Sequence, residues 1–540
     1  MKKIFVILLS LLFVFSFPSC AADSSDDPSQ PISSNETSLT SNDSAAQENN
    51  MVIINSGYAE ENYPAFEAVQ AQYPDKTILV WAFEGLAADS FAHFRTKEIN
   101  EYLDSLGYDF AVCFTCISTY NDDGTETFYI DRYREMVEKG EQIDILHVFF
   151  SNMAEGCYNA YCTCAQYGLF APLNEYLKSE AGTELYNLMP ENYWTGLRIN
   201  GSIYGVDGTM SSIGESYGYY VNAELADKYG FDVTKPVAEQ LDVLQQVKEN
   251  ENCDVFAYGG NKLSSPLYYF SSAKDVTNAV YWDEETESAR CVLDDPEFLE
   301  KLRLFDTLKK NGLLTDGQYG ISGSFFIAQV HVKGGSAVYG RETAIDFDYL
   351  DNGNTVKAYP VYNDPVSVRT ASNATGICSA SQNKDKAFQL LTLTQMDPYL
   401  NNLMVYGIEG TDYNMTSDSK SDTLADSTFL RRYANYMICC GNTVILDPPE
   451  ITAEEYEAIY ENAIVYEASD FVFDSKNVIQ EVYDTYKAMS MFELPDNDTA
   501  IDEAISDMRQ SLEEAGIQKI INECNRQYEE WKNESQAGTA

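Results

Sequence analysis

The chain has 540 residues and a formal net charge of −50 at pH 7, from 85 Asp and Glu against 35 Lys and Arg. A surface this acidic repels polyanions, which argues against nucleic acid and anionic membranes as partners and favours neutral or cationic solutes. After the first twenty residues no apolar run reaches the roughly 18 residues of a membrane-spanning helix, and the remainder is long enough for two lobes.

The amino terminus has the pattern of a processing signal. Lys2 and Lys3 precede an apolar run over residues 4–17, which is too short to span a bilayer core of about 30 Å. Ser19-Cys20 follows, and a small residue before a cysteine is typical of a bacterial lipoprotein cleavage site. We therefore expect residues 1–20 to be a lipoprotein signal peptide with lipidation at Cys20. The alternative is a plain signal peptide cut near Ala21-Ala22.

Residues 21–50 are rich in Asp, Glu, Ser and Asn and contain no Lys or Arg. Such a segment buries too little apolar surface to offset its ordering entropy, so we expect a disordered tether. Together with the anchor, this predicts a protein held at the extracytoplasmic face of the cell membrane.

From residue 76 onward the pattern alternates between strands and helices. Continuous apolar runs predict buried strands over 77–83, 109–117 and 143–150, and helical spacing predicts helices over 86–106 and 130–139. Strands that alternate with helices at this spacing indicate an α/β fold with a parallel sheet.

In an open parallel sheet, ligands bind beyond the carboxyl ends of the strands. This rule selects Trp81 and Glu84 after the first run, and Phe150 and Asn152 after the third. The alternative is that the aromatic residues are core and that Asn152 only caps a helix. Two further tryptophans are expected to pack structurally, Trp282 at a surface hairpin and Trp531 in a C-terminal helix.

The twelve cysteines do not form a recognisable metal site. Cys113 and Cys116 lie in a predicted strand, where residues three apart are about 10 Å from each other and face opposite sides. Cys157 and Cys164 are two helical turns apart, which is too far for one zinc ion. We expect buried free thiols, and no metal or other cofactor.

Catalytic signatures are also lacking. The chain has three histidines, no nucleophile elbow, no phosphate loop and no HExxH motif. A carbohydrate-active hydrolase could work with two carboxylates alone, and a surface adhesin or other non-transport lipoprotein needs no catalytic group. These two classes remain alternatives to a binding protein, but no pair of carboxylates stands out, and we expect no enzyme.

Several segments resemble the extracellular solute-binding proteins of carbohydrate ABC importers, which share the two-lobed fold of maltose-binding protein. Residues 167–177, YGLFAPLNEYL, are similar to the family pattern GLL-x-PLD-x-YL, and residues 200–206, NGSIYGV, resemble NGKIYGVP. Residues 219–230 resemble YxVNKELxDKYG. Residues 406–413, YGIEGTDY, and the carboxyl-terminal segment from Phe471 resemble one large subgroup of that family.

This resemblance implies a two-lobed periplasmic-binding-protein-like fold (type II), with a ligand cleft between lobes joined by hinge segments. The crossings are expected near 208–216, 332–335 and 407–412. The implied organisation is lobe 1 over 51–210 and 335–410, and lobe 2 over 211–334 and 411–540.

The resemblance also extends the set of expected ligand-binding residues. Asp207, Glu215 and Tyr217 border the first crossing, and Tyr339, Arg341 and Glu342 follow a strand that ends in the family's cleft. The implied partners are a small solute, expected from charge and aromatic content to be a mono- or oligosaccharide, and the permease subunits of an ABC transporter. The implied protein is a monomer that contacts the membrane only through its lipid anchor.

Overall fold

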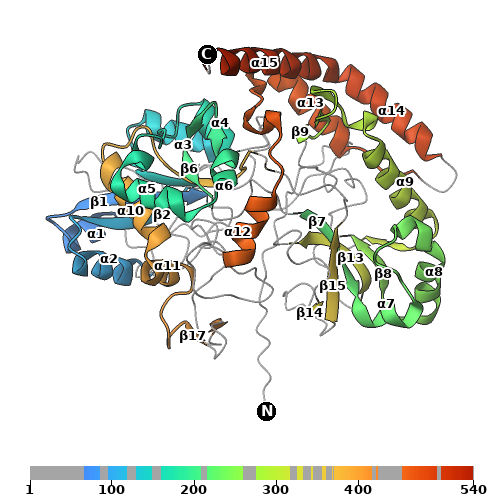
Figure 1. Cartoon of the computed structure of the whole chain (residues 1–540), viewed down its shortest axis with the longest axis horizontal. Coiled ribbons are helices and arrows are strands. Elements are labelled where there is room, and N and C mark those ends of the chain that lie inside the picture. The colour runs from blue at the N-terminus through green and yellow to red at the C-terminus, as the bar shows by residue number, and fades with distance from the viewer. Residues whose placement is uncertain are drawn as a thin grey trace, which may run out of the picture. The chain divides into compact units, whose positions relative to one another are not determined.

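The computed structural model describes most of the chain between residues 66 and 538 (Figure 1). The described ranges are 66–84, 95–117, 129–148, 160–207, 216–258, 275–316, 325–332, 342–344, 355–360, 368, 370–415, 421–423, 453–495 and 500–538. The expected signal peptide, Cys20 and the tether lie outside these ranges. Among the described helices, none is long and apolar enough to cross a membrane.

The first sheet has five strands in the order β2-β1-β3-β16-β6. Its strands are β1 (Thr77–Glu84), β2 (Phe110–Ile117), β3 (Ile145–Val148), β6 (Gly205–Val206) and β16 (Ala374–Ile377). Strand β1 runs parallel to β2 and β3, whereas β16 runs antiparallel to β3 and β6. The three predicted strands are thus present, and both neighbours of β1 are parallel to it, as expected from the apolar runs.

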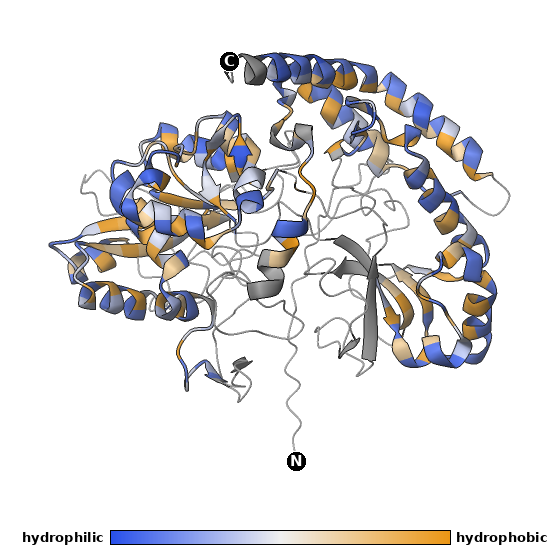
Figure 2. Cartoon of the chain, viewed as in Figure 1, coloured by the Kyte–Doolittle hydropathy of each residue, from blue (hydrophilic) through white to orange (hydrophobic). Residues whose placement is uncertain are grey.

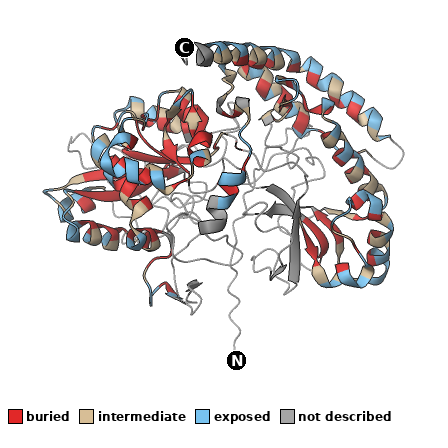
Figure 3. Cartoon of the chain, viewed as in Figure 1, coloured by how far each residue is buried: buried red, intermediate tan, exposed pale blue. Residues whose placement is uncertain are grey.

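Helices surround the first sheet and bury its strands (Figure 3). They are α1 (Phe66–Gln72), α2 (Thr96–Ser105), α3 (Tyr129–Glu138), α4 (Ala160–Gln166), α5 (Glu180–Leu188), α6 (Glu191–Gly196), α10 (Lys384–Met396), α11 (Pro398–Val405) and α12 (Ala453–Asn462). Helix α2 packs Ile99 and Leu103 into the core. Its Asn100 side chain accepts a hydrogen bond from the Val112 N–H at 2.7 Å and donates to the Val112 carbonyl at 2.9 Å. The side-chain amide therefore pairs with β2 as a strand would.

The second sheet has six strands in the order β12-β8-β13-β7-β15-β14. They are β7 (Ser216–Asn222), β8 (Asp254–Tyr258), β12 (Leu314–Asp316), β13 (Phe325–Val332), β14 (Glu342–Ala344) and β15 (Thr355–Pro360). Helices α7 (Ala223–Tyr229), α8 (Leu241–Asn250) and α9 (Pro296–Lys310) pack on it. Asn222 caps α7 by accepting from the Leu225 N–H at 3.0 Å, and Gly230, at φ +69°, ends the helix in the left-handed region.

Three C-terminal helices complete the second part of the chain: α13 (Ile479–Ser490), α14 (Ile501–Glu514) and α15 (Ile517–Gly538). They bury Leu512, Ile520 and Tyr528 in the same core as the second sheet. Shorter elements are β4 (Arg198–Ile199), β5 (Ser202–Ile203), β9 (Asp275–Thr277), β10 (Val280–Asp283), β11 (Ser288–Cys291), β17 (Tyr413–Met415), β18 (Ser421–Thr423), η2 (Tyr176–Lys178), η3 (Val237–Gln240), η5 (Val292–Asp294), η9 (Glu467–Asp470) and η10 (Ser475–Val478).

The described chain thus buries two large apolar cores, one around each large sheet, and a small third cluster that includes Val69 and Ile78. Along α14 the apolar and polar residues lie on different faces of the helix (Figure 2). The first core gathers residues between 79 and 206 with others between 368 and 463, and the second gathers 221–327 with 478–528. Tyr413 and Tyr460 belong to the first core although both lie in the range expected for lobe 2. The expected lobe boundaries remain predictions.

The seven cysteines whose side chains the structure describes are not bonded in disulfides. Cys113, Cys162, Cys164, Cys291, Cys378 and Cys524 are buried, and Cys253 is partly buried. Burial raises the pKa of Cys113 to about 12, which keeps that thiol protonated and inert. Within the described ranges no group of three or more His, Cys, Asp or Glu side chains could hold a metal ion.

Candidate functional site

The strand register of the first sheet shows which residues lie at its carboxyl edge. One row across the five strands contains Cys116, Phe83, His147, Thr375 and Val206. The next row outward holds Glu84, paired with Ile117, and Ala374, paired with Val148, and Asp207 is one residue beyond Val206. Two expected ligand residues, Glu84 and Asp207, therefore lie at the same edge of the sheet.

Asp207 is fully buried. Its backbone N–H donates to the Tyr193 hydroxyl at 2.8 Å, and the same hydroxyl donates to the Asp207 carbonyl at 3.2 Å. Tyr193 is itself fully buried against Trp194 and Tyr460. This arrangement fixes the backbone of Asp207 at the edge, but it leaves no part of the Asp207 side chain open to solvent.

His147 lies one row inside the edge, beside Thr375. Its Nδ1 is 2.9 Å from the Thr375 hydroxyl oxygen, and both side chains are buried. Burial lowers the pKa of His147 from 6.5 to about 3, because the charged imidazolium is disfavoured away from water. At neutral pH the ring is therefore a neutral hydrogen-bonding group under the edge.

This burial predicts a pH dependence of stability. Because the pKa of His147 is lower in the folded chain than the ordinary 6.5, the unfolded chain binds the proton first as the pH falls. The contribution of His147 to the free energy of unfolding is complete above about pH 6.5. It is lost between pH 6.5 and pH 3, at up to about 1.4 kcal/mol per pH unit. We expect the difference in unfolding free energy between the wild type and His147→Asn to shrink over this window in denaturant titrations. A difference in unfolding free energy that stays constant between pH 6.5 and pH 3 would contradict this prediction.

Trp81 lies within β1, three residues before the end of the strand. The side chain is fully buried in the first core and packs on Phe114, with ring centroids 5.6 Å apart. Its indole N–H has no hydrogen-bond partner among the described residues. In this structure Trp81 presents no ring face to solvent, so its expected role as a sugar platform remains a prediction.

The second sheet has an equivalent edge. Tyr217 pairs with His331, next to the pair of Ser216 with Val332 that ends β13. The backbone of Tyr217 therefore lies at the carboxyl end of β13. Glu342 begins β14 and pairs with Lys357, in the row of Val221 rather than that of Tyr217. The strand pairing does not place Glu342 beside Tyr217.

The other expected ligand residues lie outside the described ranges: Phe150, Asn152, Glu215, Tyr339 and Arg341. The first and second expected crossings also fall mostly outside these ranges, because residues 208–215 and 333–341 are not described.

Within the described ranges, a change of core lies beyond the crossing expected near 407–412, which itself stays a prediction. The segment after α12 still belongs to the first core, since the Val368 N–H donates to the Ile464 carbonyl at 2.8 Å and the Ser469 hydroxyl donates to the Val368 carbonyl at 3.0 Å. Beyond it, Val472 packs against the first core, whereas Phe471 and Phe473 pack against the second. The chain therefore passes from one core to the other between Ala463 and Asp474.

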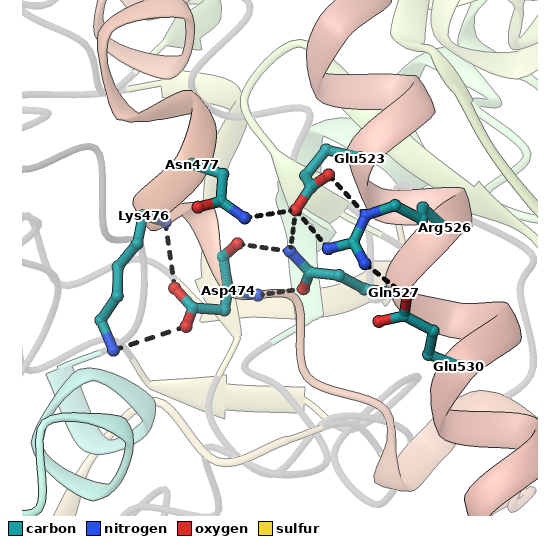
Figure 4. Close-up of polar contacts among 7 residues, drawn as sticks. All are labelled: Asp474, Lys476, Asn477, Glu523, Arg526, Gln527 and Glu530. Atoms are coloured by element: carbon teal, nitrogen blue, oxygen red, sulfur yellow. Dashed lines mark hydrogen bonds and ion pairs between the residues drawn. The ribbon is translucent and has the colours of Figure 1, made fainter.

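A polar cluster fixes the far end of this passage (Figure 4). The Asp474 N–H donates to the Gln527 side-chain oxygen at 2.8 Å, and the Gln527 amide donates back to the Asp474 carbonyl at 2.8 Å. Gln527 also donates to Glu523, which accepts from Arg526 and Asn477. These hydrogen bonds, with Arg526 the largest contributor, lower the pKa of Glu523 to about 2. The Gln527 side chain of α15 thereby binds the backbone of the crossing segment, residues 463–474, at Asp474.

The two sheets, two cores and the crossing segment define the class of fold: the chain has the fold of the two-lobed solute-binding proteins, as the sequence predicted. The N-glycan transport solute binding protein (NgtS) of Streptococcus pneumoniae matches with a TM-score of 0.60 at 21% identity, covering 84% of this chain and 99% of that one. An extracellular solute-binding protein from Bifidobacterium longum subsp. infantis matches with a TM-score of 0.53 at 13% identity, covering 84% and 98%.

Sequence comparison gives a more specific similarity. The chain is 25% identical over 393 residues to a protein of Streptococcus pneumoniae serotype 4 named carbohydrate ABC transporter substrate-binding protein, a match that covers 69% of this chain and 78% of the relative. A family model described as a domain of unknown function, DUF3502, matches residues 467–533. That match begins in the crossing segment, covers α13 and α14, and ends within α15.

Proposed function

We propose that this chain is the extracytoplasmic substrate-binding component of an ABC importer, which captures a small carbohydrate and delivers it to the permease. The observation that carries this function is the similarity to a carbohydrate ABC transporter substrate-binding protein over 69% of the chain, combined with the two-lobed fold. Proteins of that kind bind their solute without altering it, so the chain is a binding protein and not an enzyme.

The proposed ligand is a neutral mono- or oligosaccharide. A net charge of −50 disfavours anionic solutes, and aromatic residues make up 13% of the chain, enough to provide stacking surfaces for sugar C–H faces. One solved structure of the pneumococcal N-glycan transport protein contains Man1GlcNAc, and its TM-score to this chain is 0.57. Short glycans of mannose and N-acetylglucosamine are therefore suitable first ligands to test.

Among the described residues, Glu84 and Tyr217 are the best placed ligand candidates, because each lies at the carboxyl edge of its own sheet. Carboxylates accept hydrogen bonds from sugar hydroxyls, and the tyrosine ring offers both a stacking face and a hydroxyl. Asp207 is assigned a supporting role beneath the edge, because its side chain is fully covered.

The proposal also includes a lipid anchor at Cys20, removal of residues 1–20, and delivery to the transmembrane subunits of an importer. The basic start, the short apolar run and the Ser-Cys pair support the anchor. The similarity to an importer's substrate-binding protein supports the permease as partner.

A binding experiment with matched variants tests the function. The mature chain is titrated calorimetrically with Man1GlcNAc and longer glycans, and with amino acids and polyamines as controls. Glu84→Gln is expected to weaken glycan binding by about 1.5–3 kcal/mol if its carboxylate accepts from the sugar. Glu101→Gln, the same change on an exposed position of α2, should leave affinity unchanged. Release of reducing ends, or binding of polyamines alone, would refute the proposed function.

A further inference from the structure

An ion pair joins two parts of the first core that are far apart in sequence. Arg95 donates through its Nε to one carboxylate oxygen of Asp412 at 3.0 Å and through its Nη2 to the other. The Asp412 side chain is 1% exposed and that of Arg95 is 20% exposed. A two-point Arg–carboxylate contact fixes orientation as well as distance, and it offsets the cost of burying the charge.

The loop that carries Asp412 is built around this carboxylate. The Ile408 N–H donates to the Asp412 carboxylate at 2.7 Å, and the Asp412 N–H donates to the Ile408 carbonyl at 2.8 Å. Gly407 has φ +82°, and a Cβ at that position would collide with the Asp412 carboxylate. A side chain at 407 would therefore be excluded both by the backbone conformation and by the space that Asp412 occupies.

The other partner, Arg95, is the N-cap residue that immediately precedes helix α2. Strand β1 ends at the carboxyl edge with Glu84, and α2 leads back to the start of the parallel strand β2. The first turn of α2 therefore lies toward the same end of the sheet as Glu84. Further along, α2 is held by the Tyr102 hydroxyl, which donates to Asp397 at 2.8 Å. Only residues 85–94 separate Glu84 from Arg95.

We propose that Asp412 is a positioning residue for the ligand site: by clamping Arg95 it fixes the start of α2, which lies toward the same end of the first sheet as Glu84. This inference rests on the proposed function, since it assigns the carboxyl edge to the ligand. Asp412 acts through Arg95 and does not contact the ligand. The pair thereby gives the YGIEGTDY segment a role in the first core.

The test compares two conservative changes with a control ion pair. Arg95→Lys keeps the charge but loses the two-point contact, and Asp412→Asn removes the charge. Each is expected to raise the Kd for the bound glycan about tenfold. Lys386→Ala removes the ion pair in which the Lys386 Nζ is 2.9 Å from the Asp109 carboxylate. Asp109 immediately precedes β2, at the amino edge of the first sheet. This control should change the Kd less than about twofold.

Hydrogen exchange of the unliganded proteins provides a readout that needs no ligand. In Arg95→Lys and Asp412→Asn, the Ile99 amide of the first turn of α2, which donates to the Arg95 carbonyl at 2.8 Å, should exchange faster. The Val112 amide, which donates to the Asn100 side chain, should stay protected. Unchanged exchange in that first turn, or an unchanged Kd in folded variants, would overturn the proposal. If the wild type binds no glycan, the proposed function fails, and the exchange result still decides whether the pair fixes α2.

Discussion

Replacing Trp81 by alanine is expected to lower the free energy of unfolding of the first core by about 3–5 kcal/mol. The indole is fully buried in the centre of β1 and packs on Phe114, so its removal leaves a cavity that the strands on either side cannot close. Denaturant titration followed by hydrogen exchange would measure the loss and locate it. Amides of β1, β2 and β3 should lose protection first.

The matched variant Trp81→Phe separates packing from ligand contact. Phenylalanine keeps most of the ring volume and removes an indole N–H that has no partner among the described residues, so we expect a much smaller loss of stability than for alanine. Glycan affinity should stay within about twofold of the wild type if Trp81 is only core. A large loss of affinity in a stable Trp81→Phe protein would show instead that the indole N–H donates to the ligand.

The contrast between Trp81 and Glu84 shows what the apolar pattern could predict. Strands covered on both faces read as continuous apolar runs, and the runs over 77–83 and 109–117 located β1 and β2 to within a residue or two. An unbroken apolar run does not, however, show which of its residues lies at the edge of the sheet. Trp81 was therefore expected among the residues at the end of the strand, whereas the pairing of Glu84 with Ile117 shows that β1 continues three residues beyond Trp81.

The change of core near Phe471 could not be predicted from the sequence for a different reason. A crossing near 407–412 was implied by the resemblance of this segment to the family, and the structure uses Gly407 and Gly410 in a tight loop after α11 that presents Asp412 to Arg95. The actual passage near Phe471 depends on which core receives α12 and which receives α15. Those contacts join residues that are more than a hundred positions apart, and no local periodicity encodes them.

The burial of Trp282 also depends on contacts that are distant in sequence. The expected hairpin exists as β10 and β11, paired from Val280 with Cys291 to Asp283 with Ser288. The tryptophan packs structurally, as expected, but the hairpin does not lie at the surface there. Trp282 is 5% exposed because Tyr528 of α15 lies 4.4 Å from it and Phe471 lies 5.8 Å from it, between ring centroids. A hairpin pattern predicts the turn, but it carries no information about a helix that arrives more than two hundred residues later.

The packing of Trp282 on Tyr528 and Phe471 predicts a second large loss of stability. Trp282→Ala is expected to lower the unfolding free energy of the second core by about 3–5 kcal/mol, because it empties the space between the hairpin, α15 and Phe471. Trp282→Phe should cost much less, since the indole N–H has no partner among the described residues. Hydrogen exchange should show the loss of protection in β10, β11 and α15.

The two alanine variants together test whether the cores are separate cooperative units. If each core unfolds by itself, Trp81→Ala should leave the exchange of α15 unchanged, and Trp282→Ala should leave that of β1 unchanged. The residues that join the cores in the crossing segment are few, with Val472 facing one core and Phe471 and Phe473 the other, so coupling through this segment should be weak. Equal loss of protection in both cores from either substitution would show that they unfold as a single cooperative unit.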